Sequence, residues 1–384
     1  MRRLYFDYNA TCPLRPAARE ALRAGLEERE VCGNPSSAHA AGRRARHLLE
    51  EARERVAAAL DAHRDEVVFT SGGSEANALA LGSTPDGRPV AVAAHEHPSV
   101  LGQPRVVTLP VEASGRVDLT ALDAGSAHAA GIPATPGMVS VALANHETGT
   151  LGDVPAALEA ARRLGALMHA DACQAVGRIP VSFRQLGVDL LSVSAHKLGG
   201  PVGIGALLVR KGTTLSPLLR GGGQEGGLRA GTEPAWLAQA FAAAAEDAVE
   251  HLDTRAGHYR RWSSDLYSYI RGVDGSCVRN SPATGGLPNT LNLSFPGRPG
   301  VSLVHRLDLE GVCVSHGSAC ASGSLEPSPV LLAMGLGHER ASCSVRISCG
   351  PDTDDDDVRT LMQRLAIVLE NVGARDTATR DARR

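Results

Sequence analysis

The sequence predicts an α/β protein in which helices cover a mostly parallel central sheet, accompanied by a smaller α+β domain. Short apolar runs alternate with helical patterns through the first two thirds of the 384-residue chain. From Pro234 onward the pattern changes to two long helices, followed by short strands among further helices. A chain of this length can bury a large core, and its size favours two domains.

The first helical period spans residues 43–60, where apolar side chains recur three or four positions apart. Seven short apolar runs then predict strands, at residues 66–70, 89–94, 105–110, 138–144, 167–171, 189–195 and 204–210. An amphipathic helix at 154–164 separates the fourth run from the fifth. Strands that alternate with helices favour parallel pairing through helical crossovers.

The remainder of the chain predicts a second unit. Helices are expected at 234–252, 255–270 and 354–372, with strands at 287–295, 312–314 and 344–348. Thr353 and Asp356 have the spacing of a capping box for the last helix, and the polar tail 373–384 is expected to fray. We therefore predict a large domain of residues 14–253 and a small domain of residues 1–13 and 254–384.

Composition excludes several classes of function. The net charge of −3 gives no general attraction to nucleic acid or to an anionic membrane. No run of about twenty apolar residues predicts a membrane span, and Asp7 precedes any possible signal-peptide core, so a cytoplasmic location is expected. The eight cysteines contain no Cys-x-x-Cys spacing, so we predict no metal site.

Lysine is rare in this chain. Of 39 Lys and Arg residues only Lys197 and Lys211 are lysines. Lys197 follows the apolar run 189–195 and precedes several glycines, which places it at the exit of a buried strand. An amine can lose its proton and attack a carbonyl, whereas a guanidinium cannot. Lys197 is therefore a candidate for a covalent bond to a carbonyl group, the alternative being a surface lysine in a turn, as we expect for Lys211.

Two other strand ends carry polar groups suited to a bound cofactor. Residues 70–77, Thr-Ser-Gly-Gly-Ser-Glu-Ala-Asn, follow a strand and open a helix, an arrangement that can hold a phosphate, although Ser74 could simply cap the helix. Asp171 ends the strand 167–171, with Gln174 one turn later. A carboxylate there can hold a ring nitrogen protonated, or it can cap a helix. Together with Lys197 these features match the needs of pyridoxal 5'-phosphate.

With these motifs in this order, the chain resembles the cysteine desulfurases, in the class V aminotransferase group of fold-type I pyridoxal-phosphate (PLP)-dependent transferases. The matching motifs are FDYNAT at 6–11, GNPSS at 33–37, TSGGSEAN at 70–77, EH at 96–97, NHETG at 145–149, HADACQ at 169–174, SAHK at 194–197, RAGT at 229–232 and SAC at 318–320. The resemblance runs nearly from end to end, and so many ordered motifs make it specific.

The resemblance implies a role for each candidate residue. Lys197 would bind the cofactor covalently, Asp171 would pair with its ring nitrogen, and His97 would stack on the ring and move protons. Gln174 and Asn145 would lie at the ring hydroxyl. The phosphate would be held by Gly73, Ser74, Ser194, His196 and, from the partner subunit of a homodimer, Thr232. The substrate would be contacted by Asn34, Asn145 and Arg346.

Arg346 lies in the predicted strand 344–348, where alternation separates it from Val345 and Ile347. From the pattern alone it is either a solvated surface arginine or an inward-facing one. The resemblance implies the second, with its planar fork on the substrate carboxylate.

Cys320 lies in a stretch with two glycines and almost no apolar anchor, which predicts a mobile, accessible thiol rather than a core cysteine. The resemblance makes it the nucleophile that carries sulfur as a persulfide, in the NifS and IscS branch. Cys173 departs from the family by replacing a hydroxyl residue beside Gln174. The chain also ends soon after its last predicted helix, without the extension by which housekeeping members bind a cluster scaffold.

The expected reaction converts L-cysteine and an acceptor thiol to L-alanine and a persulfide, for iron–sulfur cluster assembly or thiolation. The sulfur-acceptor protein cannot be named from the sequence. An aminotransferase or a selenocysteine lyase on the same fold is the nearest alternative, and the reaction products distinguish them. A non-catalytic sulfur-binding or cluster-binding protein is a further alternative, which would contain no cofactor.

Overall fold

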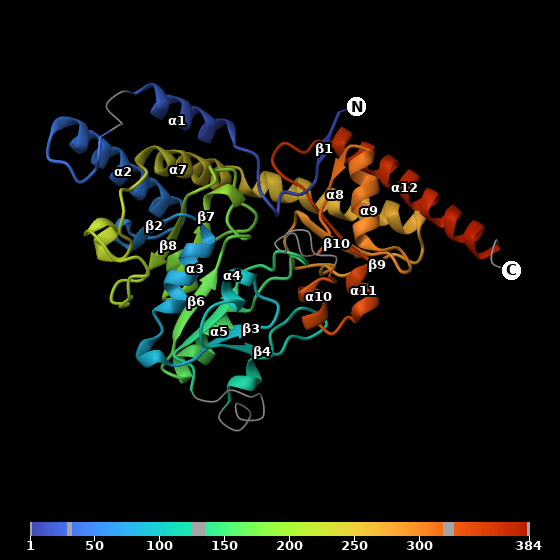
Figure 1. The fold of residues 1–384 in the computed structure, drawn as a ribbon, viewed down its shortest axis with the longest axis horizontal. Helices are drawn as coiled ribbons and strands as arrows, with labels where there is room; N and C mark the ends of the chain where they lie inside the picture. Colours follow the sequence, from blue (N-terminus) through green and yellow to red (C-terminus); the bar gives the residue numbers. More distant parts are fainter. Residues whose placement is uncertain (1, 29–32, 124–134, 318–325, 382–384) are drawn as a thin grey trace.

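The computed structural model describes residues 2–28, 33–123, 135–317 and 326–381, with side chains described as far as Glu370 (Figure 1). Its main sheet has seven strands, in the spatial order β2 (Val67–Thr70), β8 (Gly205–Val209), β7 (Leu190–Ser194), β6 (Leu167–Asp171), β5 (Met138–Ala142), β3 (Val90–Ala93) and β4 (Val106–Leu109). β8 runs antiparallel to both of its neighbours, and the other pairs are parallel. The predicted mostly parallel α/β sheet is confirmed.

Helices cover both faces of this sheet (Figure 1). One face packs on α1 (Pro16–Glu27), α2 (Ala40–Ala59), α5 (Val154–Arg163), α6 (Phe183–Leu186) and α7 (Ala235–Glu250), and the other on α3 (Gly73–Gly82) and α4 (Pro98–Leu101). Strand alternation produces this division, because Leu191 and Leu208 face the first group while Leu190 and Leu207 face the second. Short 3₁₀ turns lie at Arg64–Glu66, Leu119–Leu122 and Ala195–Lys197.

The remaining elements form two small sheets and a second set of helices, seen on the right of Figure 1. β10 (Thr290–Ser294) pairs antiparallel with β12 (Ser344–Ser348) and β9 (Val278–Arg279), and β1 (Leu4–Tyr5) pairs with β11 (Val312–Cys313). The helices are α8 (Leu252–Val273), α9 (Gly300–Leu309), α10 (Pro329–Ala333), α11 (His338–Ser342) and α12 (Asp355–Asp381). No helix among the described residues has the length and apolar character needed to cross a bilayer.

The buried apolar residues of the two units form separate clusters. The clusters on the two faces of the main sheet draw on residues from Ala18 to Ala248. A third cluster joins Leu4 and Phe6 to residues between Tyr259 and Leu369. This separation supports the division that we propose, with residues 14–253 as one domain and residues 1–13 and 254–384 as the other.

The last helix differs from the prediction at both ends. The reciprocal cap is formed by Asp354 and Asp357, whose side chains each accept a hydrogen bond from the other's backbone amide. Thr353 instead accepts a hydrogen bond from the amide of Gly350, at 3.0 Å, so it closes the preceding turn. The helix also continues to Asp381 instead of ending near 372. A single glycine such as Gly373 costs a helix only about 1 kcal/mol and need not end it.

A buried ion pair fixes the glycine-rich segment 221–231 to the main sheet. Arg53 of α2 makes two parallel hydrogen bonds to Glu225, at 2.7 and 2.8 Å, and the Glu225 side chain is 1% exposed. Glu225 also accepts a hydrogen bond from the amide of Phe69, at 2.8 Å. Farther along the segment, Arg229 binds Glu75 of α3 at 2.9 Å.

We predict that Arg53→Met destabilises the protein by about 3–5 kcal/mol, because it leaves the Glu225 carboxylate buried without its partner. Arg55→Met is the matched control on the same helix, since Arg55 pairs with a Glu246 side chain that is 45% exposed. That pair should contribute about 0–1 kcal/mol. Denaturant unfolding of both variants measures the difference, and equal losses would show that the buried pair does not fix the segment.

Candidate active site

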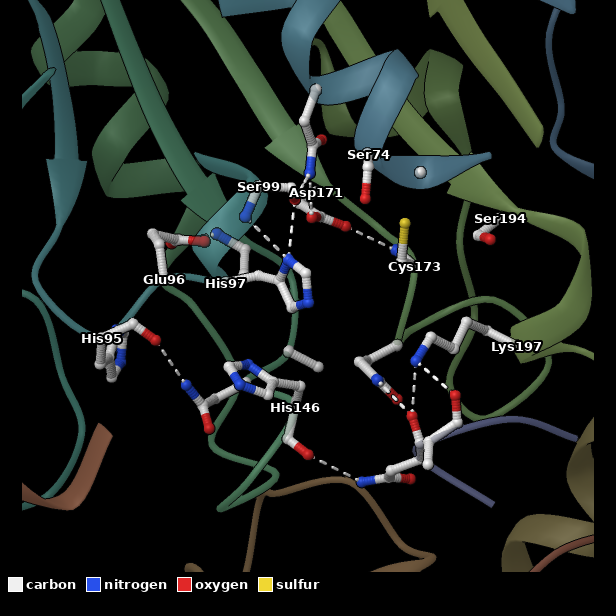
Figure 2. A pocket seen from close by; sticks show the side chains of 18 of the residues that line it. Ser74, His95, Glu96, His97, Ser99, His146, Asp171, Cys173, Ser194 and Lys197 are labelled. Carbon is white, nitrogen blue, oxygen red and sulfur yellow. Dashed lines mark hydrogen bonds between the residues drawn. The ribbon is translucent and has the colours of Figure 1, made fainter. Parts of the chain in front are cut away.

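A cavity of about 420 Å³ lies at the carboxyl ends of β5, β6 and β7 (Figure 2). Among the residues that line it are these predicted site residues: Gly73, Ser74, His97, Asn145, Asp171, Gln174, Ser194, His196, Lys197 and Arg346. Parallel strands bring their carboxyl ends to one edge of a sheet, which is why residues far apart in the sequence meet here. Arg346 comes from β12, so the small sheet of β9, β10 and β12 contributes to the cavity as well as the main sheet.

Three predicted site residues are not among those lining this cavity. Asn34 is exposed, and its side-chain oxygen accepts a hydrogen bond from the amide of Ser36, at 2.8 Å. The single chain therefore gives no support for Asn34 as a substrate contact. Thr232 is also exposed. Cys320 lies outside the described residues.

Lys197 lies in the 3₁₀ turn that follows β7. Its Nζ donates hydrogen bonds to the carbonyl oxygens of Asn9 and Ala10, both at 2.8 Å. Gly199 has φ +94°, and a Cβ there would lie 2.4 Å from the Cγ of Arg15, so only glycine fits this close approach. Lys211, by contrast, is exposed.

Asp171 is the last residue of β6 and is 7% exposed. One carboxylate oxygen accepts from the amide of Cys173 and the other from the side-chain amide of Asn77, each at 2.8 Å. No helix begins at Asp171, so the helix-capping alternative is wrong, and the carboxylate instead closes the turn at Cys173. The same two hydrogen bonds hold the carboxylate in one orientation at the cavity wall.

The N-terminus of α3 forms another wall of the cavity (Figure 2). Gly72 is its N-cap and supplies no side-chain cap, so the alternative of Ser74 as the N-cap is wrong. The first-turn amides and the positive end of the helix dipole are therefore available to an anion. A Cβ on Gly73 would lie 2.5 Å from the Sγ of Cys173, so the backbone approaches the cavity only because residue 73 is glycine.

His97 caps the short helix α4. Its Nδ1 accepts a hydrogen bond from the amide of Ser99, at 3.1 Å, which assigns the proton of the neutral ring to Nε2. Burial lowers the pKa of His97, although the nearby Asp171 partly offsets this effect. The ring of His146 meets it edge to face, with centroids 5.3 Å apart. His97 is thus a neutral imidazole at the cavity wall.

Arg346 is 2% exposed, so the alternative of a solvated surface arginine is wrong. Its Nη2 binds Asp7 at 2.6 Å and its Nη1 donates to the carbonyl oxygen of His146 at 2.9 Å. Nε has no hydrogen-bond partner among the described residues. The guanidinium is therefore held in place while some of its donors remain unused.

Several residues of the cavity wall were not predicted as site residues from the sequence, among them Asn77, His95, Glu96, Ser99 and His146. Glu96 is 2% exposed, and one of its oxygens accepts from the amide of Ala142 at 2.7 Å. The other oxygen is buried without a partner among the described residues. Burial raises the pKa of Glu96 to about 8, so it is mainly protonated at neutral pH. Its position beside His97 was the available signal.

These groups fit pyridoxal phosphate. Amides at a helix N-terminus suit a phosphate, a fixed carboxylate suits a protonated ring nitrogen, and an amine in the same cavity suits the aldehyde. The fold and the site therefore define the class as that of fold-type I pyridoxal-phosphate-dependent transferases.

Comparison with known proteins agrees with this class. The family model for aminotransferase class V matches residues 4–361. Cysteine desulfurase IscS of Dictyoglomus turgidum is 39% identical over 97% of this chain and 95% of its own length. The IscS-like cysteine desulfurase of Mycobacterium tuberculosis is 37% identical over 94% of this chain and 95% of its own length. A solved NifS-like protein has a TM-score of 0.86 at 32% identity, covering 96% of this chain and 99% of its own.

The chain belongs to the aminotransferase class-V family, in the group that contains the NifS-like and IscS-like cysteine desulfurases.

The buried carboxyl of Glu96 predicts a pH dependence of stability. Between the usual glutamate pKa and about 8, the folded state binds a proton that the unfolded state has released. Unfolding free energy should therefore fall as pH rises from 5 to 8, by up to about 1.4 kcal/mol per pH unit from this group. Glu96→Gln should reduce that slope in cofactor-free protein, measured by denaturant unfolding. The exposed Glu250→Gln is the control, and equal slopes in all three proteins would contradict the prediction.

Proposed function

We propose that the protein is a pyridoxal-phosphate-dependent cysteine desulfurase that converts L-cysteine to L-alanine and passes the sulfur on as a Cys320 persulfide. The observation that carries the proposal is one cavity lined by Lys197, Asp171, the α3 N-terminus and Arg346. An amine, a carboxylate, an anion site and a guanidinium are the groups that the cofactor and an α-amino acid require. The names of the relatives support cysteine as the amino acid.

When bound, pyridoxal phosphate supplies an electron sink for the bonding electrons of the substrate α-carbon. Lys197 is the residue for covalent attachment, and Asp171 would bind the ring nitrogen. Gln174 and Asn145 both line the cavity and would face the ring hydroxyl. The phosphate would be held by Gly73, Ser74, Ser194 and His196, with Thr232 from a second subunit.

Lys197 and His97 are the groups that would move protons. The amine of Lys197 is held by two carbonyl oxygens, and a neutral amine there can take the α-proton from the substrate. His97 carries its proton on Nε2, because its Nδ1 accepts from the amide of Ser99, and burial lowers its pKa, so its imidazole would act by donating that proton.

Arg346 would bind the substrate carboxylate. A guanidinium has five N–H donors. Among the described residues, Asp7 and the carbonyl oxygen of His146 take one each, so donors remain that a carboxylate in the cavity could bind. Because Asp7 already holds the Arg346 side chain in one orientation, binding of the substrate would not carry the entropy cost of ordering the guanidinium.

The chain next to Cys320 supports its role as the nucleophile. Ser315 exchanges backbone hydrogen bonds with Arg346, at 2.7 and 3.1 Å, so the segment leading to Cys320 starts beside a residue of the cavity wall. In the proposed reaction, the Cys320 thiolate attacks the substrate sulfur. The carbon–sulfur bond breaks, a sulfur–sulfur bond forms, and the β-carbon takes up a proton to give alanine.

The proposed enzyme is a cytoplasmic homodimer whose persulfide goes to an acceptor protein of unknown identity. Thr232 is exposed directly after the segment that Glu225 and Arg229 anchor, where it can reach a second subunit. Leu218 and Leu219, near that segment, are 51% and 46% exposed in the single chain. Exposed apolar side chains of this kind are expected where a second subunit would cover them.

The experiment that tests the proposed function is product analysis with Cys320→Ser. The wild type should release alanine and, with a reducing thiol, sulfide from L-cysteine. Cys320→Ser should bind the cofactor equally well yet form almost no alanine, because serine cannot form a persulfide. Keto-acid formation would indicate an aminotransferase instead, and wild-type alanine formation by Cys320→Ser would refute the assigned nucleophile.

Sharing of the site between subunits can be tested by mixing two defective chains. Thr232→Val should weaken cofactor binding by about tenfold, the usual effect of losing one hydrogen bond to a charged group. In a heterodimer of Thr232→Val with Lys197→Ala, the site that keeps Lys197 receives an intact Thr232 from its partner. One site per dimer should then bind the cofactor with wild-type affinity, whereas weak binding at that site would place Thr232 in its own subunit's cavity.

A further inference from the structure

Glu147 is a buried carboxyl group that the proposed chemistry does not use. It follows His146 in the turn after β5, and its side chain is 1% exposed. Its backbone is fixed at both ends, since the amide donates to Oδ1 of Asn145 at 2.9 Å and the carbonyl accepts from Nδ2 of Asn292 at 3.3 Å. Asn292 belongs to β10, so Glu147 lies where the two proposed domains meet.

The side chain of Glu147 binds the residue that opens α10. The Ser328 hydroxyl donates a hydrogen bond to Oε2 of Glu147 and accepts one from the amide of Leu331, at 3.0 Å. Ser328 is fully buried and is the N-cap of α10. The start of α10 is thereby attached to the turn after β5.

Gly317 also lies close to Ser328 and to the Glu147 side chain. It has φ +25°, and a Cβ on it would lie 2.7 Å from the Cβ of Ser328 and 3.5 Å from Oε2 of Glu147. Two residues earlier, Ser315 pairs with Arg346 of the cavity wall. The two ends of the stretch between Gly317 and Ser328, which contains Cys320, therefore meet at one carboxyl group.

Among the described residues, no lysine or arginine forms an ion pair with this carboxyl group that would explain its burial. Nε2 of His146 lies 3.7 Å from Oε1, but burial lowers the pKa of that histidine well below its usual value. Oε1 has no hydrogen-bond partner among the described residues. Burial raises the pKa of Glu147 to about 7, with only partial compensation from Ser328 and Arg346. Burying a carboxyl group with one oxygen unpartnered lowers the stability of the fold. The hydrogen bond from Ser328 is the interaction that gives this buried group a role.

We propose that Glu147 is a positioning residue for sulfur transfer, because its hydrogen bond to Ser328 holds together the ends of the Cys320-bearing stretch, one of which begins beside Arg346 of the cavity wall. This inference rests on the proposed function, in which Cys320 must approach the substrate sulfur. Glu147 would touch neither cofactor nor substrate, since it does not line the cavity. Its loss should therefore affect the sulfur-transfer step and leave cofactor binding unchanged.

The chain contains a matched control for the Ser328 contact. Ser182 caps α6, donates to Oδ2 of Asp61 and accepts from the amide of Gln185 at 3.1 Å. Ser328→Ala and Ser182→Ala therefore remove the same pair of interactions, one beside Gly317 and the other at a different helix. Glu147→Ala removes the acceptor, whereas Glu147→Gln keeps a carbonyl oxygen that can accept from Ser328.

Glu147→Ala and Ser328→Ala should lower kcat for alanine formation by about tenfold or more, because small misplacements of a nucleophile are costly. Their KM and their affinity for pyridoxal phosphate should stay within about twofold of wild type. Glu147→Gln should retain at least half of kcat, and Ser182→Ala should match wild type. An unchanged kcat in Ser328→Ala, or a loss of kcat that follows loss of cofactor affinity, overturns the proposal.

A second readout does not depend on desulfurase activity. In the absence of cysteine, the rate at which iodoacetamide alkylates Cys320, followed by peptide mass spectrometry, should rise about threefold or more in Glu147→Ala and Ser328→Ala. The rate should stay at the wild-type value in Glu147→Gln and Ser182→Ala. Equal rates in all variants overturn the positioning role. If instead the rates change as expected but wild type forms no alanine, the proposed function fails and the structural tie stands.

Discussion

Two backbone carbonyl oxygens, those of Asn9 and Ala10, hold the amine of Lys197, and the rest of the site is arranged around that contact. The oxygen of Asn9 also accepts a hydrogen bond from Gln174, at 3.0 Å. The Asn9 side chain donates to Thr290 of β10, at 2.9 Å. One short N-terminal segment thus connects the strand ends of the main sheet to the small sheet that contains β10, and residues from both of these sheets line the cavity.

Arg178 strengthens this connection through hydrogen bonds to the same segments. It is buried, donates to the carbonyl oxygens of Tyr8 and Lys197 at 2.9 and 3.3 Å, and also binds Gln174. No carboxylate pairs with it among the described residues, and burial lowers its pKa to about 10. A guanidinium held by carbonyl oxygens is therefore part of the support for the segment that orients Lys197.

Much of the fold and the main features of the site could be predicted from the sequence, because strand ends and rare residue types are local signals. The run before Lys197, the acid that ends β6 and the glycines before α3 each indicate a role without knowledge of the fold. The hydrogen bond between Glu147 and Ser328 could not be predicted, since the two residues are 181 positions apart and neither has a local sequence pattern that marks it as buried. The burial of Glu96 and the exposure of Asn34 likewise depend on packing between distant segments. The N-cap of α12 is Asp354 instead of Thr353. Several adjacent acidic residues could each form this cap, and their spacing in the sequence does not show which one does.

The central claim is that Lys197 is the residue to which the cofactor binds covalently. Borohydride reduction of the protein with pyridoxal phosphate, followed by peptide mass spectrometry, tests it most directly because reduction makes the attachment permanent. We expect a pyridoxyl group on Lys197 at about one per chain and none on Lys211, the other lysine of the chain. Labelling of Lys211, or equal labelling of both lysines, would contradict it.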